Sequence, residues 1–410
     1  MIRHSYKPVK ISRSAIFFFV LGALALDVNF PRIGFKTGNL VLIFCLGLSF
    51  FFHCRANDFR LCWPRLGIAS KIYLCYLTLA LLSALWAPSA GDTVFQVLIL
   101  FIIWFSAVLI SYAPPQLFIR YVAYVGVIAA ILSIAMMAVS SKYAYQPISS
   151  SDRRELRGIF EHQLRLGLFA GSTLAVMGIA WLNKEVKKVF PSFTLLLVFA
   201  PIVALACFLA YARLYTLFVI LAFLLTYFFS KGRFIRWISS IGILVVVVLA
   251  IIFQGNFEST LADAGIDTTL TGRVRIWTLS LEEARTSPWL GHGYASFDAP
   301  IYDSMWGVGI YRPPHPHNSY IQAFFENGYL GFALILLLSI VHFRLAAYPE
   351  AVDGRFSYSL FFITLLILGS LTGANYAAKP ATLFCLALWL ITAKETRGRM
   401  RPLRLTWSRK

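Results

Sequence analysis

The chain has 410 residues, of which 59% are hydrophobic and only 13% are charged. A soluble globular domain is typically about 45–50% apolar and about 25% charged, so this composition excludes an ordinary soluble protein. The net charge of +19 would suggest nucleic-acid binding in a soluble chain. In a membrane protein the positive-inside rule accounts for the same excess of Lys and Arg, and we expect no nucleic-acid partner.

Apolar runs of about 20 residues, the length that crosses about 30 Å of hydrocarbon, recur along the whole chain. They predict an all-α, polytopic membrane protein with about twelve transmembrane helices in a single membrane domain over residues 1–410. Only residues 211–213 separate two of these runs, so the boundary between these two predicted spans is not fixed by the sequence. The first run lacks a small-residue cleavage site, which predicts a retained helix. The predicted spans are 14–30, 38–54, 70–87, 93–112, 118–140, 160–182, 190–210, 214–229, 238–254, 319–342, 356–375 and 380–393.

The distribution of Lys and Arg predicts the orientation of the chain. With the N-terminus in the cytoplasm, the cytoplasmic segments carry 24 of the 37 basic residues but only 5 of the 18 acidic residues. This asymmetry follows the positive-inside rule, so we expect an even number of spans and both termini in the cytoplasm. The longest extramembrane stretch, 255–318, then lies between spans nine and ten on the opposite side of the membrane.

Nine arginines between residues 153 and 312 nevertheless fall on the side that this rule depletes. Snorkelling or pairing with nearby glutamates would explain any single one of them. The group as a whole indicates an anionic ligand, because the planar guanidinium group binds phosphate in a bidentate manner. The nine residues are Arg153, Arg154, Arg157, Arg165, Arg213, Arg273, Arg275, Arg285 and Arg312.

The long loop contains a predicted amphipathic helix over residues 271–286, TGRVRIWTLSLEEART. Apolar residues recur in it with helical spacing, Thr271 is a suitable N-cap, and Ser287-Pro288 ends the pattern. Arg273 would lie in the first turn, where unpaired backbone N–H groups favour anions. The segment that follows, PWLGHGYASF, predicts a tight turn near the membrane surface.

The stretch PPHPHNSYIQAFFENGYLG, residues 313–331, contains the residues best suited to chemistry. Its prolines resist helix formation, so the following span is expected to start at His317 or Asn318. The helix dipole disfavours the imidazolium form at that position, which leaves His317 able to accept a proton. Gly328 and Gly331 predict close helix–helix approach in the membrane.

This stretch resembles a known family. His317-Asn318, nine residues, Gly328, two residues and Gly331 are similar to the H-N-x9-G-x-x-G pattern of the bacterial O-antigen ligases. TGRVRIW, PWLGHG and RGIFEHQLRLG also resemble stretches of the wider O-antigen ligase/polymerase superfamily of polytopic glycosyltransferases. The number of spans, the loop position and the order of motifs agree over nearly the whole chain.

The resemblance implies a GT-C-like fold and an enzyme of lipopolysaccharide biosynthesis. Such ligases transfer a glycan from undecaprenyl pyrophosphate to a hydroxyl of the lipid A–core oligosaccharide, at the periplasmic face of the bacterial inner membrane. They use no nucleotide cofactor and require no metal, so the implied partners are the lipid-linked donor, the lipid A–core acceptor and membrane lipids. The essential histidine of the family corresponds to His317, and its two essential arginines correspond to Arg213 and Arg273.

The chemistry of these residues agrees with that assignment. A hydroxyl that attacks an anomeric carbon needs a base within about 3 Å, which His317 can supply. Fixed guanidinium groups would stabilise the departing pyrophosphate. Direct displacement would invert the anomeric configuration, and the close carboxylate pair of retaining hydrolases is not apparent. The further residues predicted to bind substrate are Arg154, Arg157, Arg275, Arg312 and Asn318.

Several of these residues also have structural interpretations. His317 could cap or pack a helix, and Arg275 and Arg285 could pair with neighbouring glutamates. Glu326 is a costly carboxylate within a span, so it is either the buried partner of an outer arginine or a second base.

A divalent metal site is a further alternative, because three histidines and two aspartates share one loop. Their spacing fits no familiar zinc pattern. The six cysteines lie in or beside apolar runs without CxxC spacing, so they predict neither zinc nor disulfides. The alternative metal ligands are His292, His315, His317, Asp298 and Asp303.

Three other functions are open. O-antigen polymerases share the scaffold and donor but often carry R-x10-G motifs, which the arginines of 141–165 and 255–318 lack. A protein O-oligosaccharyltransferase would use the same histidine motif, usually with additional C-terminal sequence. A transporter of polyprenyl-linked glycans should show repeat symmetry and charged or broken helices at mid-membrane, whereas the polar groups here are predicted at one face.

Overall fold

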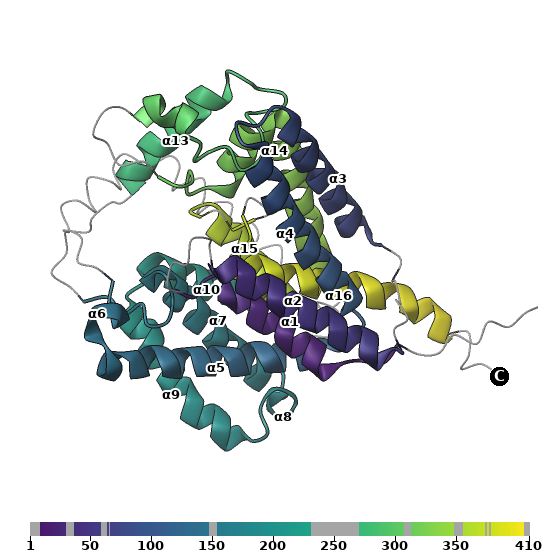
Figure 1. Cartoon of the computed structure of the whole chain (residues 1–410). Coiled ribbons are helices and arrows are strands. Elements are labelled where there is room, and N and C mark those ends of the chain that lie inside the picture. The colour runs from purple at the N-terminus through teal and green to yellow at the C-terminus, as the bar shows by residue number, and fades with distance from the viewer. Residues whose placement is uncertain are drawn as a thin grey trace, which may run out of the picture. The chain divides into compact units, whose positions relative to one another are not determined.

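A computed structural model describes residues 9–29, 37–58, 64, 66–146, 154–230, 270–306, 313–347, 356–373, 375–376 and 379–405. In these ranges the regular structure is helical, and β-structure is limited to isolated bridges (Figure 1). The predicted all-α, polytopic fold class is therefore confirmed. The predicted span 238–254 lies outside the described residues.

Helices occur at each of the other predicted spans. Within the described ranges, eight helical segments are long and apolar enough to cross a membrane. They are α2 (Thr37–Ala56), α3 (Ile68–Leu82) with the 3-10 turn η1 (Ser83–Leu85), α4 (Ala90–Leu109), α5 (Pro115–Val139), α7 (Gln163–Leu182), α9 (Phe193–Ala210), α10 (Arg213–Ser230) and α14 (Ser319–Ala347). Apolar but shorter are α1 (Arg13–Ala25) and α15 (Tyr358–Ser370), and α16 (Thr382–Leu405) continues into the basic C-terminal segment.

The two runs beside residues 211–213 are separate helices. Tyr211 ends α9 in a left-handed conformation with φ of 54°, and α10 begins at Arg213. A left-handed residue at this position stops the helical hydrogen-bond pattern. The turn places Arg213 in the first turn of a new helix, whose unpaired N–H groups favour anions.

The chain divides into two compact units. Unit 1 consists of Met1–Tyr73, Leu98–Leu221 and Pro380–Lys410, and unit 2 consists of Leu74–Val97 and Ala222–Lys379. Each unit is described by itself below. The single membrane domain over 1–410 stays a prediction.

In unit 1, α1 runs beside α2 and also packs against α5 and α16, while α5, α7 and α9 pack against one another (Figure 1). Small residues permit these close approaches. A Cβ on Gly22 of α1 would lie 2.9 Å from Cys45 of α2, and a Cβ on Gly126 of α5 would collide with Thr173 of α7. The shortest packing distances in this unit thus depend on glycine.

In unit 2, α14 is broken at Gly328, where φ is 62° and ψ is −160°. The Tyr320 hydroxyl lies 3.2 Å from Ser339 Oγ, although 19 residues separate them. An unbroken helix would place them roughly 28 Å apart, so the two limbs lie side by side and the chain reverses at the break. The second limb, 329–347, is by itself about 28 Å long, enough to cross the hydrocarbon core.

Candidate functional site

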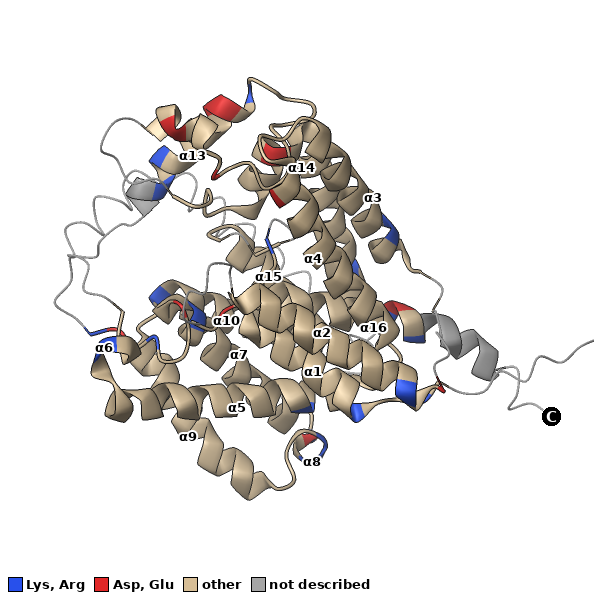
Figure 2. Ribbon diagram, viewed as in Figure 1, with Lys and Arg blue, Asp and Glu red and all other residues tan. Residues whose placement is uncertain are grey.

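The predicted amphipathic helix is α13 (Leu270–Ala284). It begins at Leu270, so Thr271 lies inside the first turn and its prediction as N-cap is wrong. Arg273 does lie in the first turn, and its side chain is half-buried. Charged residues lie mostly at helix ends and connections, but α13 carries both signs along its length (Figure 2).

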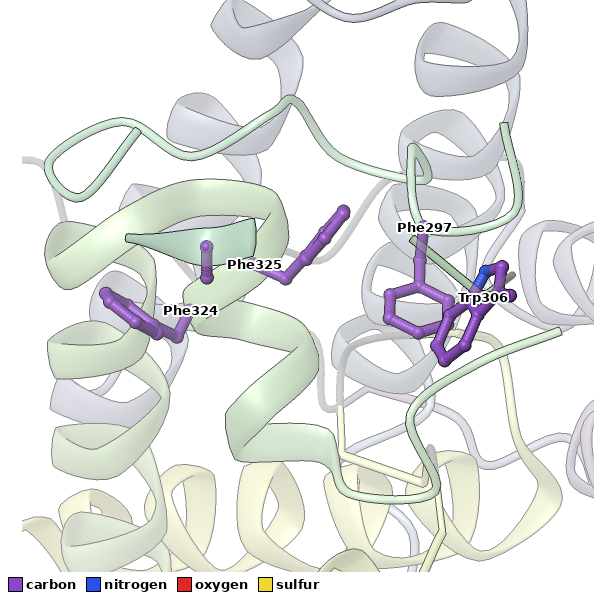
Figure 3. Close-up of a cluster of buried hydrophobic side chains, with 5 residues drawn as sticks. Phe297, Trp306, Phe324 and Phe325 are labelled. Carbon is purple, nitrogen blue, oxygen red and sulfur yellow. The ribbon is translucent and has the colours of Figure 1, made fainter. Parts of the chain in front are cut away.

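A buried aromatic cluster in unit 2 joins α13 to α14 and to the 3-10 helix η2 (Pro300–Trp306). Figure 3 shows four of its members, Phe297, Trp306, Phe324 and Phe325, and Ala284 of α13 completes it. Phe297 and Phe325 pack edge to face with ring centroids 5.0 Å apart. Such pairs contribute about 0.5–1.5 kcal/mol beyond burial, so the cluster fixes α13 on the first limb of α14.

The glycine-rich loop after α13 fills the break in α14. The N–H groups of His292 and Gly293 donate to the carbonyl oxygens of Phe325 and Glu326, at 2.9 and 2.8 Å. A helix break leaves backbone groups unpaired, and these bonds satisfy them. The loop therefore stabilises a reversal that would be costly in the membrane without such partners.

Gly328 is required at this contact. A Cβ at Gly328 would collide with the backbone carbonyl of Trp289 in the loop, and a Cβ at Gly331 would collide with the Asn327 side chain across the break. The prediction that glycine permits helix–helix approach is therefore wrong for Gly328, whereas a Cβ at Gly331 would lie 3.1 Å from the Ala323 carbonyl oxygen of the facing limb. Gly328 allows approach of the loop, and Gly331 makes room for the reversal itself.

Asn318 caps the first limb of α14. Its Oδ1 accepts from the N–H groups of Tyr320 at 2.9 Å and Ile321 at 3.1 Å, and its Nδ2 donates to the Leu371 carbonyl at 3.2 Å. The helix thus begins at Ser319, and His317 directly precedes the cap. These contacts give Asn318 a capping role, and its binding of substrate stays a prediction.

His317 adopts a left-handed backbone conformation with φ of 53°. Its N–H donates to His315 Nδ1 at 3.2 Å, and the two imidazole rings meet edge to face with centroids 4.2 Å apart. This conformation costs a residue with a Cβ about 1–2 kcal/mol. Backbone strain of this kind persists only where surrounding contacts hold it, and it clusters at functional sites.

Two donors hold the loop that carries His317. Trp277 Nε1 of α13 donates to the Pro316 carbonyl at 2.8 Å, and Lys379 Nζ donates to the Pro314 carbonyl at 2.9 Å. Arg273 precedes Trp277 by four residues, so both lie on one face of α13. Arg273 and the His317 loop are thereby on the same side of this helix.

Lys379 is a site residue that the sequence reasoning missed. In the sequence it is a single lysine in the gap between two spans, and its proximity to residues 313–317 carries no sequence signal. The carboxylate of Asp298 lies 3.9 Å from Lys379 Nζ.

Glu326 is fully buried beside the break in α14. Its Oε1 accepts from Gln322 Nε2 at 2.9 Å. Among the described residues, the charged groups that act on this carboxylate are Lys379 and Asp298. Among the described residues the cation that acts on Glu326 is therefore a lysine and not an arginine, and Arg153 and Arg312 lie outside that part of the chain.

Arg275 of α13 and Arg285, which directly follows this helix, do not pair with the neighbouring glutamates. Arg275 and Arg285 are exposed, and within the described residues neither forms an ion pair with Glu282 or Glu283. The Glu283 carboxylate lies 3.8 Å from His292 Nε2 instead. The structural interpretation of Arg275 and Arg285 as ion-pair partners is therefore wrong.

Unit 1 holds the other described arginines. The N–H of Leu156 donates to the Leu209 carbonyl at 3.0 Å. This bond ties the loop that carries Arg154 and Arg157 to the end of α9, one short turn before Arg213. Three of the predicted phosphate-binding residues thus lie on adjoining segments.

Two of these guanidinium groups are oriented by neighbours. Arg157 Nε donates to the Tyr143 carbonyl at 3.0 Å. Arg213 lies over the Tyr211 ring, 4.3 Å from its centroid, and also contacts the Tyr211 hydroxyl. Stacking on an aromatic ring fixes the plane of the guanidinium fork, which reduces the entropy lost when it binds a phosphate.

The same loop is anchored at the start of α7. His162 is the N-cap of α7, and its Nδ1 accepts from the Leu164 N–H at 3.2 Å. Burial, and then the positive charges of Arg165 and Arg157, lower the pKa of His162 to about 4. His162 is therefore neutral at neutral pH, beside these two arginines. Arg165 also pairs with Asp27 at 3.5 Å.

The predicted site residues thus fall into two groups. Unit 1 contains Arg154, Arg157 and Arg213, and unit 2 contains Arg273, Arg275, His317 and Asn318. Arg153 and Arg312 lie outside the described residues. The meeting of His317, Arg213 and Arg273 at one substrate stays a prediction.

The alternative metal ligands are not assembled in the part of the chain that the structure describes. No three His, Cys, Asp or Glu side chains there lie close enough to share an ion. His292 Nε2 lies 3.1 Å from the Glu283 carbonyl, and its ring packs against Tyr302 and Phe325.

The fold and these residues define a polytopic helical membrane protein that presents arginine and histidine side chains near the ends of its helices. Residues 193–336 match the family described as O-antigen ligase. Over 104 residues the chain is 31% identical to the exopolysaccharide production protein ExoQ of Rhizobium meliloti (strain 1021). That match covers 24% of this chain and 24% of ExoQ, so the chain spans about a quarter of that relative. These matches confirm the resemblance to the O-antigen ligase/polymerase superfamily that the sequence predicted.

The matched region contains the histidine and most of the predicted arginines. Arg154 and Arg157 lie before it. Within residues 193–336 are Arg213, Arg273, Arg275, Arg312, His317 and Asn318.

Proposed function

We propose that this protein is an O-antigen ligase, which transfers a glycan from undecaprenyl pyrophosphate to a hydroxyl of the lipid A–core oligosaccharide. The observation that carries the proposal is the clamped loop before α14. It holds His317 in a left-handed conformation and is bonded to α13, the helix that presents Arg273. Both residues lie in the segment that matches the O-antigen ligase family.

In the proposed reaction, His317 accepts the proton of the acceptor hydroxyl as the oxygen attacks the anomeric carbon. The bond from that carbon to the phosphate oxygen breaks, and undecaprenyl pyrophosphate leaves with both bonding electrons. The new glycosidic bond has the inverted configuration. The proton on His317 then passes to solvent.

Charge develops on the departing pyrophosphate, and the arginines are proposed to bind it. Arg213 and Arg273 each lie in the first turn of a helix, so their guanidinium groups add to N–H groups that already favour anions. Arg154, Arg157, Arg275 and Arg312 are proposed to bind other parts of the donor. Preorganised donors of this type contribute most where water is excluded.

The relative ExoQ supports a second candidate. Its printed name assigns it to exopolysaccharide production, so chain extension of an exopolysaccharide is the alternative reaction. The acceptor would then be a second glycan, and the same histidine and arginines would act on the same kind of donor.

The broken helix in unit 2 bears on a transporter function. Broken helices with buried carboxylates line the ion sites of many transporters. In α14 the freed carbonyls of Phe325 and Glu326 are instead bonded to His292 and Gly293. The break is filled by protein, which favours an enzyme scaffold over an ion pathway.

The deciding experiment is transfer by the purified protein in lipid nanodiscs, with a glycan on undecaprenyl pyrophosphate as donor. Three acceptors are supplied separately: lipid A–core, a second lipid-linked glycan and a serine-containing peptide. Modification of lipid A–core alone supports the ligase. Product on the lipid-linked glycan supports the polymerase, product on the peptide supports a protein O-oligosaccharyltransferase, and no product from folded protein refutes all three.

A further inference from the structure

Lys379 lies at the end of unit 2, in the connection between α15 and α16. Its ammonium donates to the Pro314 carbonyl at 2.9 Å, three residues before His317, and lies 3.9 Å from the Asp298 carboxylate. Its side chain is only 24% exposed. A lysine held by a carbonyl and a carboxylate in this way has lost most of the freedom that surface lysines keep.

The connection that carries Lys379 is itself fixed to the start of α14. Ser319 Oγ donates to the Gly373 carbonyl at 2.8 Å and accepts from the N–H groups of Asn375 and Tyr376 at 2.9 and 3.0 Å. Ser319 is fully buried. Residues 373, 375 and 376, which shortly precede Lys379, are therefore held at the start of α14.

The loop needs such support because its conformation is strained. His317 has a positive φ, and the flanking prolines cannot donate backbone hydrogen bonds. The carbonyls of Pro314 and Pro316 are two groups by which neighbours hold the loop, one through Lys379 and the other through Trp277. Loss of either donor should let the loop relax.

We propose that Lys379 is a positioning residue for His317. Its ammonium holds the Pro314 carbonyl, which keeps the loop in the strained conformation that aims the imidazole at the acceptor hydroxyl. The catalytic consequence of this inference rests on the proposed function. The hydrogen bond between Lys379 and the loop does not depend on that function.

The test compares Lys379→Met, which keeps the length but removes donor and charge, with Lys379→Arg, which keeps both. Lys187→Met, at an exposed lysine of the short helix α8 (Val186–Val189), is the matched control. Misplacement of a catalytic group by about 1 Å costs on the order of 10²-fold in rate. We expect Lys379→Met to lower kcat by about 10- to 100-fold with little change in KM, Lys379→Arg to recover most of it, and Lys187→Met to match the native protein.

A second readout does not depend on the reaction. Hydrogen–deuterium exchange at the amides of His315, His317 and Asn318 should be faster in Lys379→Met than in the native protein, and normal in Lys379→Arg. Trp277→Phe, which removes the other donor and keeps an aromatic ring, should accelerate exchange at the same amides. Thermal unfolding in detergent establishes that each variant is folded.

The outcomes separate the two proposals. If native protein transfers no glycan to any acceptor, the proposed function fails, and the exchange data alone decide the role of Lys379. Native exchange at these amides in folded Lys379→Met overturns the positioning role. A raised KM with unchanged exchange also overturns it, because Lys379 would then contact substrate directly.

Discussion

His317 is held by its backbone as much as by its side chain. His317 has a left-handed φ of 53° and contacts His315 directly before the N-cap of α14. Asn318 accepts from the N–H groups of Tyr320 and Ile321, so His317 stands directly before a capped helix end.

Replacement of His317 should abolish transfer. His317→Asn is the sharper variant, because asparagine tolerates the left-handed region but cannot act as a base. General-base catalysis contributes about 10²- to 10⁴-fold, so transfer to lipid A–core should fall by that factor while membrane insertion is unchanged. Product formation is followed by a mobility shift of the acceptor. Native-like transfer by His317→Asn would exclude the base assignment.

Glycan transfer should require the forked guanidinium group at both Arg213 and Arg273. Alanine at either position should lower transfer by about 10²- to 10³-fold, the effect of removing one preorganised donor. Lysine keeps the charge but not the bidentate geometry, so it should restore only part of the rate. Arg285→Ala, at an exposed position directly after α13, is the control. Full activity with lysine at both positions would rule out bidentate phosphate binding.

His162 predicts a pH dependence of stability in unit 1. Its pKa is lowered to about 4, below the ordinary 6.5, so the folded state binds fewer protons than the unfolded state between these values. Stability should therefore be full above about pH 6.5 and decline as the pH falls toward 4. Protonation would also remove the acceptor for the Leu164 N–H.

The check is thermal unfolding in detergent between pH 7 and 4. His162→Asn keeps an N-cap but does not titrate, so its unfolding temperature should fall less than that of the native protein over this range. Equal slopes for the two proteins would show that His162 does not contribute to the pH dependence.

Among the elements, α14 is the one whose form differs most from an ordinary span. Its first limb is short and folds back on the second, and the glycine-rich loop fills the reversal. The loop, the first limb and α13 share the aromatic cluster of Figure 3, so they form one packed assembly in unit 2. The loop that carries His317 leads into the first limb of α14 in this assembly.

Gly328→Ala should destabilise the fold. The new Cβ would occupy a left-handed conformation and collide with the Trp289 carbonyl, at a cost on the order of 1–3 kcal/mol. The unfolding temperature in detergent should therefore fall by several degrees. Gly47→Ala in α2 is the matched control, because no atom lies within 4 Å of the added Cβ and no loss is expected. Equal unfolding temperatures for both variants would contradict this account of the break.

At the scale of the whole molecule, the charge distribution predicts one orientation in the membrane. Both termini and α8 are expected in the cytoplasm, and the loop after α13 in the periplasm. Trp289 is 68% exposed in that loop, and Lys187 is exposed on α8. Single cysteines at these two positions, in a protein whose native cysteines are removed, show by their labelling on which side of the membrane each position lies.

An impermeant maleimide applied to spheroplasts should label Trp289→Cys at once and Lys187→Cys only after permeabilisation. The reverse pattern would place the His317 loop in the cytoplasm and would contradict the proposed periplasmic reaction. Labelling of both without permeabilisation would contradict the predicted number of crossings between them.

The all-α polytopic class followed from apolar run length alone, because a chain must bury its backbone polar groups within each span to cross hydrocarbon. The position of α13 also followed from a local pattern, the helical spacing of its apolar residues. The prediction that residues 313–331 carry the chemistry rests on the order of His317, Asn318 and the glycines. Such signals are local, so the sequence contains them directly.

Only the tertiary structure revealed that the chain reverses at Gly328. It also revealed that Trp277 and Lys379 hold the His317 loop by hydrogen bonds. These depend on contacts between residues far apart in the chain, such as Tyr320 with Ser339 and Lys379 with Pro314. A continuous apolar run predicts one straight span, because hydropathy does not register the conformation of a single glycine. The strained histidine is likewise a property of the contacts around it, which exist only once the helices have packed.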